Sequence, residues 1–168
     1  ILAQGANQSA ASVDDLGYAF KYAAPMASQL GISLEELSAM TGIMVDQGLK
    51  GEQAGTALRK VFSVLSDDAG VTGKKLKELG VEIKDTSTGK MKPMSEIVKD
   101  LSKGLEKYDD VQKAAWIKSV FGTEALSGLL MLMEAGPDEI EKMTKALEES
   151  GGASQEAADQ MLEGWAGA

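Results

Sequence analysis

The sequence contains no cysteine and no histidine. These absences exclude disulfide bonds, thiolate nucleophiles, imidazole bases and the side chains that most transition-metal sites use. Long apolar runs are also missing, because the longest, from Leu126 to Met133, is far shorter than the ~20 residues of a membrane-spanning helix. Basic residues are outnumbered, 17 against 26 acidic ones, for a net charge of -9. This balance disfavours nucleic acid and anionic membranes as partners, and we expect no cofactor and no metal.

What the chain does contain is enough apolar material for a core. Hydrophobic residues make up 43% of the 168 positions, and a chain of this length buries roughly 70% of its unfolded surface. We therefore predict that residues 1–168 form a single helical domain. The sequence begins at Ile1, and residues 1–11 resemble the end of a preceding helix, so we interpret the domain as an excised fragment of a much longer chain.

The stretch from Gly31 to Leu65 predicts two helices joined by a short link at Gly48. Ser33 is a good N-cap, and Glu36 three residues later predicts a reciprocal capping box. The second helix contains Gly55, which costs roughly 1 kcal/mol against alanine in a helix interior. We therefore expect another backbone to lie close to Gly55.

Helical periodicity extends over most of the remaining chain. Ser12 with Asp15, and Asp109 with Gln112, predict capping boxes, and Pro25 predicts either a kink or a division into two helices. The expected helices run through residues 16–30, 74–79, 94–108, 111–121, 126–133, 140–147 and 158–165, and Thr123 is expected to cap the one that contains 126–133. We expect the helix over 111–121 to be largely surrounded and the one that contains 126–133 to be central, because each is apolar around much of its circumference.

One segment changes period. Val81 and Ile83 alternate with charged residues, a polar turn cluster occupies 85–89, and Met91 follows. This pattern predicts a small β-hairpin near 81–92. The predicted fold is thus mainly α, a compact domain of about eight or nine helices with one small β-hairpin.

Acidic residues are the first candidates for chemistry. Four acidic doublets occur, but each falls at a predicted helix start, where the helix dipole favours negative charge. The twelve residues from Asp85 to Glu96 resemble a calcium-binding loop only at their ends, because Gly89 is misplaced and Pro93 and two lysines replace ligands. We predict no catalytic residue, no cofactor-binding residue and no metal ligand, and we predict that the protein is not an enzyme.

Nine methionines are present, and methionine can adapt to several partners on an exposed surface. Most of them fall on predicted inward faces. Met91 and Met94, beside the expected hairpin, are the pair that we expect to be exposed and to contact a partner.

Four stretches taken together resemble the core region of bacteriophage tail tape measure proteins, a minor tail protein family. They read GISLEEL, DQGLKGEQAGTALR, LGVEIKDTSTGKMKPMSEIVKDL and VFGTEALSGLL. The resemblance implies a structural virion component that acts in tail assembly and tail length determination. It also implies contacts with the tail tube protein, with tail assembly chaperones or with further copies of the chain, in the virion or in the host bacterial cytoplasm during assembly.

Two alternatives stay open at this point. One is a generic helical protein-binding domain of a bacterial or prophage protein with no tail role, since nothing in the helical pattern is specific to tails. The other, less well supported, is a small-ligand or calcium-binding regulator.

Overall fold

A computed structural model describes residues 12–149 and 163. Eight helices occupy the first of these ranges, and the expectations for residues 1–11 and 158–165 lie outside the described residues apart from Glu163. The helices are α2 (Val13–Leu30), α3 (Leu34–Asp46), α4 (Gly51–Leu65), α5 (Val71–Leu79), α6 (Met94–Gly104), α7 (Asp110–Phe121), α8 (Thr123–Ala135) and α9 (Pro137–Glu149).

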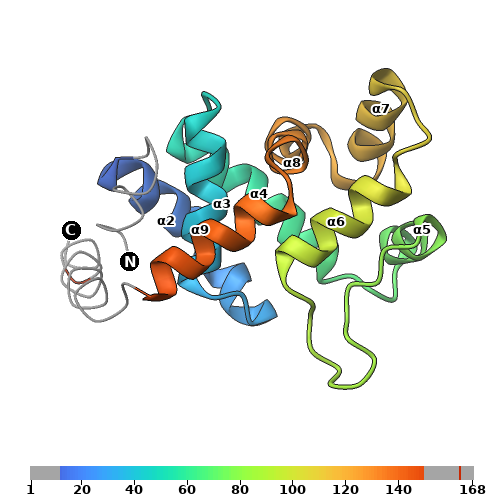
Figure 1. Cartoon of the computed structure of the whole chain (residues 1–168), viewed down its shortest axis with the longest axis horizontal. Coiled ribbons are helices and arrows are strands. Elements are labelled where there is room, and N and C mark those ends of the chain that lie inside the picture. Colours follow the sequence, from blue (N-terminus) through green and yellow to red (C-terminus); the bar gives the residue numbers. More distant parts are fainter. Residues whose placement is uncertain (1–11, 150–162, 164–168) are drawn as a thin grey trace.

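Helices α4 and α8 connect the two ends of the molecule (Figure 1). Helix α4 packs against α2, α3, α5, α7 and α8, and α8 packs in turn against α3, α6, α7 and α9. Figure 1 shows α2, α3 and α9 at one end and α5, α6 and α7 at the other. A single contiguous core of buried apolar side chains runs through all eight helices.

The predicted β-hairpin is wrong, because no strand forms among residues 12–149. Lys84 and Met91 make only an isolated antiparallel bridge within the connection between α5 and α6. The next hydrogen-bonded pair of such a ladder would be Val81 with Met94. The N–H of Val81 instead donates to the carbonyl of Leu76 at the end of α5, and that of Met94 donates to the Glu36 carboxylate. The donors that would extend the ladder are therefore used elsewhere.

Local capping was largely predictable. Ser12 and Asp15 form the expected capping box at the start of α2, and Asp109 and Gln112 form theirs at the start of α7. At the start of α3 only half of the expected box is present. The Ser33 hydroxyl accepts a hydrogen bond from the N–H of Glu36 at 3.1 Å, but the Glu36 carboxylate reaches a different helix.

Close packing of α2 on α4 confirms the prediction for Gly55. A Cβ atom at this position would lie 2.8 Å from the Cα atom of Ala19, closer than real side chains approach a backbone. One turn earlier, a Cβ at Gly51 would collide with the backbone of Asp15. The two glycines therefore allow α2 and α4 to touch along their backbones.

Helix α7 is less buried than predicted. Only Ile117, Val120 and Phe121 of this helix are buried, whereas Val111 is 79% exposed. The most enclosed helix is α3, in which eight consecutive residues from Leu37 to Met44 are buried. Apolar composition failed as a guide because α7 lies at one end of the molecule, where its outer face has no neighbour among the described helices (Figure 1).

Helix α2 runs without interruption from Val13 to Leu30 and contains Pro25. Of the two alternatives for Pro25, the division into two helices is therefore wrong, and the kink stays a prediction. Helix α8 is one of the two connecting helices, as expected, although Thr123 is its first residue rather than its cap.

Candidate interaction surfaces

The connection between α5 and α6 projects from the helices as an ordered loop (Figure 1). Its base is fixed because the side chains of Val81 and Ile83 are buried in the core. At its tip, a carboxylate oxygen of Asp85 accepts hydrogen bonds from the backbone N–H and the hydroxyl of Ser87, at 2.8 and 2.6 Å. These hydrogen bonds lower the pKa of Asp85. Residues 84–90 are all exposed, so the loop presents a polar surface of defined shape.

The two methionines beside this loop differ in exposure. Met94 is fully buried as the first residue of α6, and Met91 is partly buried against the core. The expectation of an exposed pair is therefore wrong for Met94. A partner contact in this region stays a prediction, with Met91 as the residue that could make it.

The segment from Asp85 to Glu96 does not gather its acidic side chains. Asp85 is at the exposed tip, whereas Glu96 is in the first turn of α6. Across residues 12–149 and 163 the structure brings together no group of three or more acidic side chains that could hold a metal ion.

Two of the acidic residues at helix starts form hydrogen bonds to other helices. Asp15 of α2 accepts a hydrogen bond from the N–H of Gly51 at 3.1 Å, and Glu36 of α3 accepts one from the N–H of Met94 at 2.6 Å. Each carboxylate thus satisfies a free N–H group at the beginning of another helix, α4 or α6. The N-cap residues of α4 and α6, Lys50 and Pro93, form no side-chain hydrogen bond to these N–H groups. These carboxylates have a structural role.

Glu36 lies at the junction of α3, α6 and α9, beside a groove of about 280 Å³. Burial raises the pKa of its carboxyl group, the hydrogen bond from Met94 opposes this shift, and the charge of Glu148 on α9 adds to it. The groove is also lined by Ser33, Pro93 and Thr144. The Glu36 carboxyl group therefore sits in partly apolar surroundings at a three-helix junction.

A second groove, of about 410 Å³, lies where α2, α4 and α8 meet. Tyr22 and Thr56 line its walls, and Gly128 lies against it. A Cβ atom at Gly128 would lie 2.8 Å from that of Ala57, so this glycine is explained by the packing of α8 on α4. The groove contains Glu52 and Glu124 but no basic side chain.

A third groove, of about 350 Å³, separates α5 from α7 at the opposite end of the molecule. Leu79, Tyr108 and Trp116 are partly buried along it, and Lys75 and Lys107 also line it. This site was not predicted from the sequence, because Trp116 belongs to a helix that was expected to be surrounded. The sequence carried no local signal for it, because Tyr108 lies in the connection between α6 and α7 and Trp116 lies on α7, so their proximity depends on the tertiary packing.

The residues 1–122 match the family model of the phage-related minor tail proteins. The chain belongs to this family. It is similar to the tape measure protein of Pneumococcus phage Dp-1, with 38% identity over 96% of this chain, and to the probable tape measure protein of Escherichia phage P2, with 36% identity over 99%. The aligned region makes up 14% and 21% of these two relatives, so the chain spans a small part of their length. No solved structure matches the fold.

None of the described helices is a candidate membrane-spanning segment. None of those between residues 12 and 149 combines the length and apolar character that crossing a bilayer requires.

Proposed function

We propose that this chain is the core segment of a tape measure protein, a structural component of the phage tail that acts in tail assembly and length determination through protein-protein contacts. The observation that carries the proposal is the similarity to two tape measure proteins over nearly the whole chain. The segment acts by surface recognition and not by catalysis.

The fold supports a specific version of this role. A continuous helical rod of 168 residues would be ~250 Å long, whereas a compact domain of this size has a radius of gyration of ~15 Å. Glycines with positive φ at Gly31, Gly48, Gly80, Gly122 and Gly136 separate the helices. The segment therefore acts as a folded domain and not as a measured length of rod.

The partners that fit this role are the tail tube protein, the tail assembly chaperones or further copies of the chain. The domain meets them in the host bacterial cytoplasm during assembly and remains in the virion. The projecting loop at residues 84–90 and the three grooves are the surfaces available for these contacts.

An in-frame deletion of the segment from its parent phage tests the proposal, with tails imaged by electron microscopy and the remaining protein followed by immunoblot. We expect no assembled tails although the shortened protein is still present. Tails that assemble but are ~250 Å shorter would contradict the compact version and favour an extended ruler segment. Normal tails of unchanged length would reject the tail role.

A further inference from the structure

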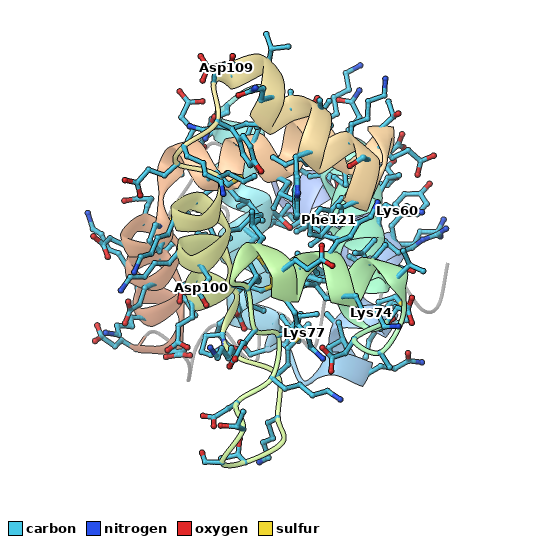
Figure 2. All side chains as sticks on the ribbon, turned by 90° about the vertical axis from the view of Figure 1, so that its right-hand side faces the viewer. Lys60, Lys74, Lys77, Asp100, Asp109 and Phe121 are labelled. Carbon is cyan, nitrogen blue, oxygen red and sulfur yellow. The ribbon has the colours of Figure 1, made fainter. Side chains whose placement is uncertain are left out.

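The groove between α5 and α7 is distinguished by its charge. Between Val71 and Phe121 the chain has eleven lysines and eight acidic residues, a local net charge of +3 in a chain of net charge -9. Figure 2 looks onto this end of the molecule, with Lys74 and Lys77 on α5 and Asp109 at the start of α7. The segment from Val71 to Phe121, which contains the residues that line the groove, is therefore more basic than the rest of the chain.

The lysines along the groove lack acidic partners. Lys75 and Lys107 line it and form no ion pair with any residue in the described ranges, whereas Lys77 nearby is 3.7 Å from Asp68. The ammonium group of Lys107 instead lies 5.5 Å from the centre of the Tyr108 ring. Glu78 is the only acidic residue in the lining. Negative groups on a partner would therefore meet unpaired positive charge.

Apolar side chains line the same groove. Trp116 is held in place by Phe121, whose ring centre is 6.5 Å away and whose side chain is buried. Leu79 and Tyr108 contribute further partly buried surface. Val71, which is 69% exposed, lies one turn before Lys75 and hence on the same face of α5. Tryptophan and tyrosine side chains are enriched at surfaces that bind proteins.

The dimensions favour a helical partner. Helix α7 has twelve residues and is ~18 Å long, which corresponds to roughly three turns of a helix lying beside it. We propose that this groove binds an acidic amphipathic helix of another protein, with large apolar side chains against Trp116 and carboxylates against Lys75 and Lys107. The inference stands on the groove alone and does not rest on the proposed function.

Nucleic acid fits the same surface less well. Glu78 lies within the groove, Asp109 and Asp110 stand at the start of α7, and the whole chain is strongly acidic. A chain of phosphates would therefore also meet negative charge along this surface. An amphipathic helix carries apolar side chains as well as carboxylates, so it matches Trp116 and Tyr108 as well as the two lysines.

Binding of a labelled synthetic peptide to the full chain, followed by fluorescence anisotropy, tests the proposal. The probe is a helix of about 14 residues with leucines at i, i+3, i+4 and i+7 and with glutamates elsewhere. Its control has lysine in place of each glutamate. The test variant is Lys75→Glu with Lys107→Glu, and the matched variant, with the same charge change on exposed positions of α2 and α9, is Lys21→Glu with Lys142→Glu.

We expect the acidic peptide to bind the wild type and the matched variant equally and the test variant at least about 10-fold more weakly. A Trp116→Ala variant should lose roughly 30-fold, the effect of removing an interface hot spot. Circular dichroism of each variant establishes that it is folded, and the charge variants change only exposed side chains, so they decide the result if Trp116→Ala does not fold.

Four results would overturn the proposal. The first is equal binding of the acidic peptide to both charge variants, and the second is equal binding of the acidic and basic peptides to the wild type. The third is tight binding of a single-stranded oligonucleotide that the test variant alone abolishes, which would assign the groove to nucleic acid. The fourth is self-association of the free chain that the test variant alone prevents, which would assign the groove to a second copy.

Discussion

Glu36 offers a direct test of how this fold joins its two ends, because its carboxylate connects α3 to the first N–H of α6. The hydrogen bond from Met94 is 2.6 Å long and partly buried. Replacing Glu36 by alanine leaves that N–H without its partner, which costs about 1–3 kcal/mol of unfolding free energy. Glu36→Gln keeps an oxygen acceptor for this N–H, so it should change stability by less than about 1 kcal/mol at pH 7.

The stability of the wild type relative to Glu36→Gln should depend on pH. The pKa of Glu36 is raised in the folded protein, chiefly by burial, so the native state binds the proton more tightly than the unfolded chain does. As pH falls through the raised folded-state pKa towards the ordinary value of 4.5, wild type should therefore gain stability relative to Glu36→Gln, which cannot titrate there. Above the folded-state pKa the difference between the two should be constant.

Urea unfolding of the wild type, Glu36→Gln and Glu36→Ala between pH 8 and pH 5 provides the measurement. Glu35→Gln is the control, because it removes a charge from the same first turn of α3 without touching Met94. Equal losses in Glu36→Gln and Glu36→Ala would refute the capping argument. A difference between wild type and Glu36→Gln that does not change with pH would refute the argument from burial.

Three further predictions concern stability and can be measured by the same urea titrations. Asp15→Ala should lose about 0.5–2 kcal/mol of unfolding free energy at neutral pH. Burial raises the pKa of Asp15, but hydrogen bonds from Ser12 and Gly51 outweigh burial and lower it, so the stabilisation by Asp15 should disappear as pH falls through the lowered pKa. A loss in Asp15→Ala that is undiminished in acid would contradict this prediction. Gly55→Ala should destabilise by about 1–3 kcal/mol, opposite to the usual effect of alanine in a helix, and a more stable variant would disprove the close approach of α2 to α4. Phe121→Ala should lose about 3–5 kcal/mol, and a loss below 1 kcal/mol would show that its buried site is not well packed.

Sequence reasoning succeeded where the interaction is local. The capping boxes at Ser12 and Asp109 involve residues three positions apart, so the chain itself specifies them. The requirement for glycine at position 55 was also recognisable, because a helix interior tolerates glycine poorly and its presence needs a reason. The partner backbone, at Ala19, was not identifiable from the sequence.

The failures concern residues far apart in the chain. Glu36 was expected to complete its own helix cap, but it binds Met94, which is 58 positions away. The same hydrogen bond takes a donor that the predicted hairpin would have needed, so one long-range contact explains two errors. Enclosure of α7 failed for a related reason, since apolar composition does not reveal that a helix will lie at the end of a molecule. The groove that contains Trp116 is a consequence of that position.

The central claim is that this segment must be folded for tails to assemble. The most direct measurement is electron microscopy of tails from a phage in which Gly55→Leu disrupts the packing of α4 on Ala19 without changing chain length. Ser63→Leu, at an exposed position of the same helix, is the matched control. The account predicts no assembled tails for Gly55→Leu, with the protein present by immunoblot, and normal tails for Ser63→Leu. Normal tails of unchanged length in both would contradict it.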